Sequence, residues 1–208
     1  MIPILFEKNT ESFNSNGIGC LADVVSCIVE EERNGAYELE MRYPIYGIHY
    51  EELVMSAIIW VTPSEGKNEQ AFRIYKITKP INGIVSIYAE HISYQLASIP
   101  VSRFSASSAS AAMAGLKEHA SVRCPFSFWT DVTRGGTFSV EAPAGIRSKL
   151  GGTKGSILDI YGGEYEWDNY MVQLRAQRGR NDGVSLRYGK IITDLSQEEN
   201  ITNTITGI

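Results

Sequence analysis

The alternation of apolar and polar residues predicts β-strands through the first hundred residues. The clearest case lies on either side of Asn34 and Gly35, where apolar positions recur at every second residue up to Tyr43. An Asn-Gly pair supplies the positive φ angles of a two-residue hairpin turn. We therefore predict a hairpin between Asp23 and Tyr43 with one buried and one exposed face, ending at Pro44, which cannot donate to a strand ladder.

Further strands follow along the chain at regular intervals. Leu53–Val61 is a continuous apolar run, as expected of a strand covered on both faces, and Gln70–Lys79 alternates. A second Asn-Gly pair, at Asn82, leads into a predicted strand over Ile84–Glu90, and a short helix is predicted over His91–Ser98. Turn signals every ~8–12 residues favour a sandwich or a barrel for this part of the chain.

A mixed segment follows, because the composition changes at Ser102. Small residues favour one helix over Ser108–Ala120, in which Ala112, Met113 and Leu116 would face inward. Shorter elements are predicted as strands over Phe126–Trp129 and Thr137–Glu141 and as helices over Ala144–Leu150 and Gly155–Tyr161.

The last part of the chain returns to β-structure. A hairpin is predicted over Gly163–Gln177 with a tight turn at Asp168-Asn169, and a further strand over Val184–Tyr188. From Ile201 to Thr206 the alternation resumes and then stops as if within a strand. We therefore expect the intact gene product to continue beyond residue 208.

Composition narrows the class of protein. The chain has 208 residues, of which 43% are hydrophobic and 21% charged, which excludes a disordered tail, a collagen-like fibre and a coiled coil. The net charge of −5 gives no overall basic surface for nucleic acid. The longest apolar run is far shorter than the ~20 residues of a membrane helix, and the N-terminus has no secretory signal. Three cysteines indicate free thiols in a reducing cytosol.

Candidate catalytic and metal-binding residues are sparse. No zinc-site spacing occurs among the three histidines (His49, His91, His119) and the three cysteines (Cys20, Cys27, Cys124). Cys124 lies five residues after His119, and a predicted helix followed by a strand would bring the two side chains together only by accident. A structural position for Cys124 is therefore favoured over a Cys/His nucleophile. The Gly-rich stretch 151–156 lacks the phosphate-loop pattern and indicates a flexible connection. Four carboxylates match no calcium loop and favour a solvated acidic face: Asp159, Glu164, Glu166 and Asp168. We predict no catalytic site, metal or cofactor.

Two features could contact a partner. Arg178 and Arg180, in the loop RGRNDG, could bind a partner's carboxylates or a phosphate by paired hydrogen bonds, or form a solvated hairpin tip. Trp129 and Trp167 could form part of a carbohydrate-binding surface, although packing in the core is the favoured interpretation.

Four segments in order resemble one family. They are EEERNGAYELEMRYP (Glu30–Pro44), AEHISYQL (Ala89–Leu96), GGEYEWDNY (Gly162–Tyr170) and RGRNDGVSLRYGKIITDL (Arg178–Leu195), with Lys190-Ile191 where the family has Lys-Asn. Together they resemble the N-terminal region of siphophage and prophage tail-tip proteins, the phage minor structural protein or prophage tail endopeptidase family.

The resemblance implies an α+β fold that is mainly β. Residues 1–100 would form a first tube-like β-barrel domain, 101–161 a lateral mixed α/β domain, and 162–208 the start of a second similar barrel, truncated here. Such proteins form homotrimers whose barrels make a ring. The ring closes the tail tube, binds the distal tail and tape-measure proteins, and leaves a lumen through which DNA passes.

The resemblance also places the protein at the virion tail tip after synthesis in the host cytoplasm, without a membrane anchor or sequence-specific nucleic-acid binding. The main alternative is a tail-associated peptidoglycan-degrading endopeptidase. In this family, wall degradation is usually assigned to separate C-terminal lytic domains, and the 208 residues lack a recognisable peptidase constellation. We therefore expect a structural role.

Overall fold

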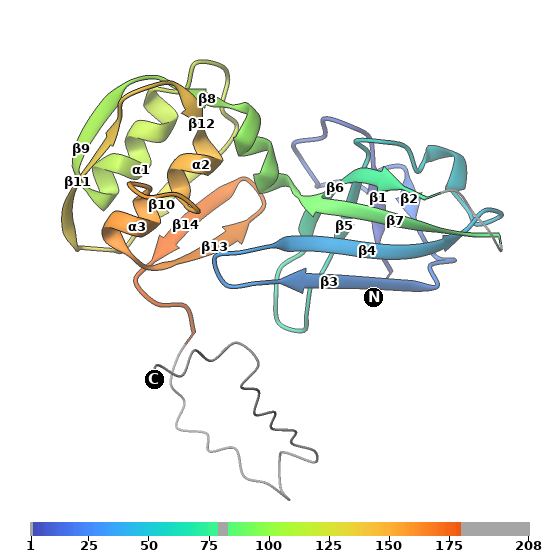
Figure 1. Ribbon diagram of the computed structural model, residues 1–208. Helices are drawn as coiled ribbons and strands as arrows, with labels where there is room; N and C mark the ends of the chain where they lie inside the picture. The colour runs from blue at the N-terminus through green and yellow to red at the C-terminus, as the bar shows by residue number, and fades with distance from the viewer. Residues whose placement is uncertain (1, 79–82, 180–208) are drawn as a thin grey trace, which may run out of the picture. The chain divides into compact units, whose positions relative to one another are not determined.

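The computed structural model describes residues 2–78 and 83–179, and this part of the chain is mainly β (Figure 1). Its first core is built on a seven-stranded antiparallel sheet that is curled like half a barrel, with the strand order β2-β1-β5-β6-β7-β4-β3. The strands are β1 (Ile4–Phe6), β2 (Gly19–Cys20), β3 (Ser26–Glu31), β4 (Tyr37–Pro44), β5 (Ile58–Val61), β6 (Gln70–Ile77) and β7 (Ile84–His91). Among the described strands the two ends, β2 and β3, do not pair with each other, so a closed barrel stays a prediction.

The first predicted hairpin is confirmed, but its turn is longer than expected. β3 and β4 pair from Ser26 opposite Arg42 to Glu31 opposite Tyr37. The Glu32 N–H then donates to the Ala36 carbonyl at 2.8 Å, which leaves a three-residue loop. A two-residue type I′ turn needs positive φ at both central residues, and only Asn34 has it, at 58°.

The predicted strand over Leu53–Val61 is only partly correct. Just Ile58–Val61 is extended, because hydrogen bonds from Leu53 N–H to Tyr50 and from Ala57 N–H to Val54 close turns after the 3₁₀ helix Tyr50–Glu52. The first two strands went unpredicted, since three and two residues are too few for an alternation to be recognised.

A second, mixed core contains helices and three small sheets (Figure 1). Its elements are the 3₁₀ helix Ile92–Ser98, β8 (Pro100–Val101), β9 (Phe104–Ser108), α1 (Ala109–Glu118), β10 (Ser127–Thr130), β11 (Gly135–Val140), β12 (Ala144–Gly145), α2 (Ile146–Leu150), α3 (Ile157–Tyr161), β13 (Glu164–Asp168) and β14 (Met171–Arg175). The sheets are β10-β14-β13, β11-β9 and β12-β8. None of the helices in the described ranges is long and apolar enough to cross a membrane.

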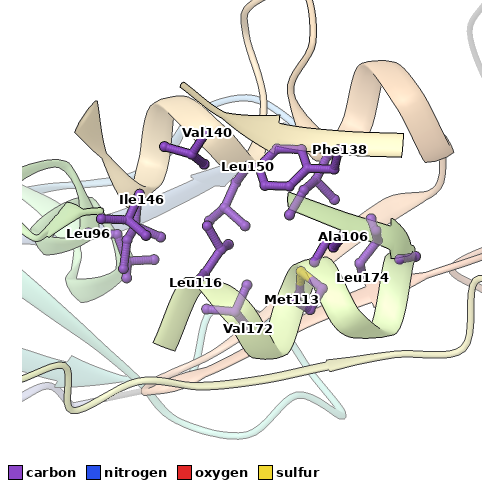
Figure 2. Packing of buried hydrophobic residues seen from close by; sticks show 14 of the residues in the cluster. Leu96, Ala106, Met113, Leu116, Phe138, Val140, Ile146, Leu150, Val172 and Leu174 are labelled. Atoms are coloured by element: carbon purple, nitrogen blue, oxygen red, sulfur yellow. The ribbon is translucent and has the colours of Figure 1, made fainter. Parts of the chain in front are cut away.

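The inward face of α1 agrees with the prediction. Ala112, Met113 and Leu116 are buried, and Figure 2 places Met113 and Leu116 in one cluster with residues of α2, β11 and β14. Ser108 begins the helix as its N-cap, because its Oγ accepts a hydrogen bond from the Ala111 N–H at 3.2 Å.

The predicted domain boundary at residue 162 falls between α3 and β13. β13 and β14 complete a sheet with β10, and Tyr165, Val172 and Leu174 are buried in the same core as α1. The division into residues 1–100, 101–161 and 162–208 stays a prediction. Asn82 and the predicted strand Val184–Tyr188 lie outside the described residues.

Candidate functional site

The tip of the β3–β4 hairpin contacts the mixed core through one asparagine side chain. Asn34 Nδ2 donates to the Gly163 carbonyl at 3.1 Å, and its Oδ1 accepts from the Tyr165 N–H at 2.7 Å. An ion pair beside it joins Arg33 Nη1 to Glu164 Oε1 at 3.1 Å. The amide of Asn34 therefore takes the place of a peptide group along the edge of β13.

The tip of the β13–β14 hairpin makes the same contact in the opposite direction. Asn169, also at positive φ (52°), donates from Nδ2 to the Glu69 carbonyl at 3.0 Å and accepts at Oδ1 from the Ala71 N–H at 2.9 Å. In both places the asparagine binds the carbonyl of one residue and the N–H of the residue two positions later. We call these the reciprocal asparagine contacts.

A buried polar network lies under the Asn169 contact. Gln70 Oε1 accepts from the Asn169 N–H at 2.8 Å and lies 3.1 Å from His91 Nε2, while Gln70 Nε2 donates to Asp168 Oδ1 at 2.9 Å. His91 Nδ1 accepts from the Ser93 N–H, so its proton sits on Nε2 and is donated to Gln70.

Burial keeps His91 neutral. The ring is fully buried and stacks on Tyr37 with 4.6 Å between ring centres. Desolvation, with a smaller contribution from the positive charge of Arg147, lowers its pKa from 6.5 to about 3. The sequence predicted no role for His91, which was one of three scattered histidines. In the structure His91 belongs to the polar network at the junction between the two cores.

The predicted partner-contact residue Arg178 is engaged within the chain. Its Nη1 lies 2.6 Å from Glu31 Oε1 and donates to the Tyr165 carbonyl at 2.9 Å, and its backbone N–H donates to Glu164 Oε2. Arg180 lies outside the described residues. A partner contact by either arginine stays a prediction.

The two residues considered as a Cys/His nucleophile pair, Cys124 and His119, both pack against apolar side chains. His119 stacks on Phe104 with 4.8 Å between ring centres, and Cys124 packs against the mixed core, where burial raises the pKa of its thiol. Burial likewise raises the pKa of the Cys27 thiol to about 11. Within residues 2–78 and 83–179, no group of three or more His, Cys, Asp or Glu side chains could hold a metal ion.

Each of the four acidic residues accepts a hydrogen bond within the chain; Asp159 is exposed, and Glu164, Glu166 and Asp168 are half-buried. Glu164 pairs with Arg33, Glu166 with Arg175, and Asp168 with Gln70. Asp159 Oδ2 accepts from the Gly155 N–H at 2.8 Å, and its own N–H donates to Ser156 Oγ. The Gly-rich stretch therefore ends in an ordered N-cap of α3 rather than a simple flexible connection.

The two candidate sugar-binding tryptophans differ in exposure. Trp167 packs against both cores and stacks on Tyr165 at 5.1 Å between ring centres, as the core-packing interpretation predicted. Trp129 is 43% exposed, with the Arg175 guanidinium 5.3 Å from its ring centre.

Five exposed apolar side chains lie on the β4–β5 connection, which Figure 1 shows at the end of the seven-stranded sheet away from the mixed core. We call this surface the apolar end and define it by these five side chains: Ile45, Tyr46, Ile48, Val54 and Met55. Tyr46 is 86% exposed. Val54 and Met55 also line a hollow of about 600 Å³ together with Ile18 and Ala57 and with three charged residues, Glu7, Lys8 and Glu52. Clustered exposed apolar side chains are typical of a surface that another molecule covers.

Comparison with solved structures identifies a shared fold. The chain is similar to a prophage tail protein, gp18, from Listeria monocytogenes EGD-e, with a TM-score of 0.61 and 14% sequence identity. The match covers 84% of this chain but 50% of gp18, so the chain spans about half the length of that protein. The sequence matches no family model and no curated protein. The family expected from the four segments therefore stays a prediction, and the comparison shows a fold shared with part of gp18.

Proposed function

We propose that this chain is a structural component of a phage or prophage tail. The observation that carries the proposal is the fold shared with gp18 over 84% of the chain. The four segments that resemble tail-tip proteins support it independently.

Within the tail, we place the chain in the tail-tip hub as a homotrimer whose sheets contribute to a ring. Two features support this position. The edge strands of the curled sheet, β2 and β3, could each pair with a strand of a neighbouring subunit. The exposed side chains of the apolar end could be buried against such a subunit. The distal tail and tape-measure proteins would be its partners, and the net charge of −5 suits a lumen that does not hold passing DNA.

We further propose that the chain acts by assembly rather than by catalysis. The raised pKa of the Cys124 thiol supports this, because a thiolate is the reactive form of cysteine. The alternative, a peptidoglycan endopeptidase, is tested by zymography on cell-wall substrate with the 208-residue chain. A clearing zone that disappears in Cys124→Ala would replace the structural proposal with the enzymatic one.

The assembly proposal is tested by the molar mass of the purified chain. Light scattering over a range of concentrations should give three times 23.0 kDa, and imaging should then reveal rings. A mass of 23.0 kDa at every concentration, unchanged by adding the distal tail protein, would contradict the hub.

A further inference from the structure

A partly buried cation lies at the junction of the two cores. Arg147, on α2, donates a side-chain hydrogen bond from Nη1 to Ser93 Oγ at 3.3 Å, and its charged form is also stabilised by the Tyr94 side chain. Among the described residues its guanidinium has no carboxylate oxygen within 4.0 Å. Since a guanidinium has five N–H donors and stays charged in proteins, most of its donor capacity is unused by the described residues.

Two aromatic rings lie against this guanidinium. Its central carbon lies 3.8 Å from the ring centre of Tyr94 and 5.4 Å from that of Trp167. A guanidinium that stacks on aromatic rings can still use its in-plane N–H groups to bind a carboxylate with two hydrogen bonds.

Arg147 lines a small pocket whose other walls lack charge. The pocket has a volume of about 170 Å³ and is bounded by Asn34, Gly35, Leu150, Gly151, Gly152, Leu158, Tyr165 and Trp167. Two carboxylates act electrostatically on Arg147, and both have other partners: Glu90 pairs with Arg73 at 3.1 Å, and Glu38 accepts from the Tyr94 hydroxyl at 3.4 Å. Arg147 is the one charged residue among the described residues that line the pocket.

The size of the pocket limits its occupant. It is smaller than the ~300 Å³ at which small-molecule sites begin. One side chain fits this space better than a sugar or a nucleotide. The leucine walls, Leu150 and Leu158, suit the methylene groups of such a side chain, with its charged end against Arg147.

We propose that this pocket binds one glutamate or aspartate side chain of a partner polypeptide, with Arg147 as the charged anchor. The inference is independent of the tail function, because it rests on the pocket alone. It assigns this chain a receptor site for an acidic residue, which neither the predicted arginine loop nor the apolar end supplies.

The test is an NMR titration of the isotope-labelled 208-residue chain with acetyl-Gly-Glu-Gly-amide. We expect saturable shifts of the Trp167 indole N–H and of the Gly151 and Gly152 amides. The matched glutamine peptide should give none. Arg147→Gln should abolish the shifts and Arg147→Lys should weaken binding about tenfold, because lysine keeps the charge but not the paired donors. Arg103→Gln, at an exposed arginine that does not line the pocket, should change nothing.

Three results would overturn the proposal. The first is an equal response to the glutamine peptide, and the second is tighter binding of inorganic phosphate at the same resonances. The third is the absence of any shift in the wild-type chain, including the case in which one of its own carboxylates already fills the pocket. Comparing the two peptides on the wild-type chain keeps the test valid even if an Arg147 variant unfolds.

Discussion

At the scale of single residues, the protonation of His91 makes the stability of the folded chain depend on pH. Its folded-state pKa of about 3 lies below the ordinary value of 6.5, so between these values the unfolded chain binds a proton that the folded chain does not. The stabilising contribution is therefore complete above about pH 6.5 and is lost as the pH falls toward 3.

We expect the free energy of unfolding to decline between pH 6.5 and 5 by up to about 1.4 kcal/mol per pH unit from this group. Urea denaturation at several pH values would measure the slope. His91→Gln should flatten it, while His119→Gln, at an exposed histidine, should leave it unchanged. Parallel slopes in wild type and His91→Gln would contradict a buried neutral imidazole.

The reciprocal asparagine contacts are also testable residue by residue. Asn169→Ala removes two hydrogen bonds to backbone and leaves the Ala71 N–H without its acceptor, so we expect a loss of about 1–3 kcal/mol beyond the effect of the turn itself. Asn9→Ala is the matched control, because Asn9 is exposed and also has positive φ, at 65°. Equal losses in the two variants, measured by denaturant titration, would mean that the contact adds nothing to stability.

At the scale of elements, Gly115 in α1 shows packing and helix propensity acting in opposite directions: glycine has a low helix propensity, but the packing leaves no room for a larger residue. A Cβ on Gly115 would lie 2.3 Å from Phe104 Cε2, the ring that stacks on His119. Helix propensity alone predicts that Gly115→Ala stabilises the protein by about 1 kcal/mol.

We expect the opposite sign for Gly115→Ala, a net destabilisation of about 1–3 kcal/mol, because the Phe104 ring must move out of its packed position. Thermal unfolding followed by circular dichroism would measure it. Ala114→Gly, at the exposed neighbouring position of the same helix, calibrates the propensity term. A higher melting temperature for Gly115→Ala would show that Phe104 yields at little cost.

The elements were more predictable than their contacts. The alternation of apolar and polar residues was sufficient to predict β4, and the positions of small and apolar residues were sufficient to predict which face of α1 is buried. The short strands β1 and β2 carried too little pattern. The sequence marked Asn34 and Asn169 as turn residues, but each binds backbone about a hundred residues or more away, and local periodicity contains no information on such pairings.

At the scale of the whole molecule, the described chain up to Arg178 forms one compact unit in which both cores are joined. The apolar end is the feature of this unit that most needs a partner, since its side chains are exposed by 40% to 86%. Burying apolar surface stabilises an assembly by roughly 25 cal/mol per Å².

If the chain forms the proposed trimer, Tyr46→Ser combined with Met55→Ser should shift it toward monomer while leaving the far-UV circular dichroism unchanged. Val122→Ser removes an exposed apolar side chain outside the apolar end and should leave the mass unaffected. Light scattering at matched concentrations compares the three chains. A trimer that survives the double substitution would place the subunit interface elsewhere.

The reciprocal asparagine contacts have a consequence for how such sequences diverge. Across the junction each asparagine side chain binds main-chain groups, so the residue that offers its carbonyl, such as Glu69, can change freely without weakening these contacts. Selection then acts on one position of each contact and spares the other. Aligned homologues should therefore keep a short amide at positions 34 and 169 while position 69 drifts.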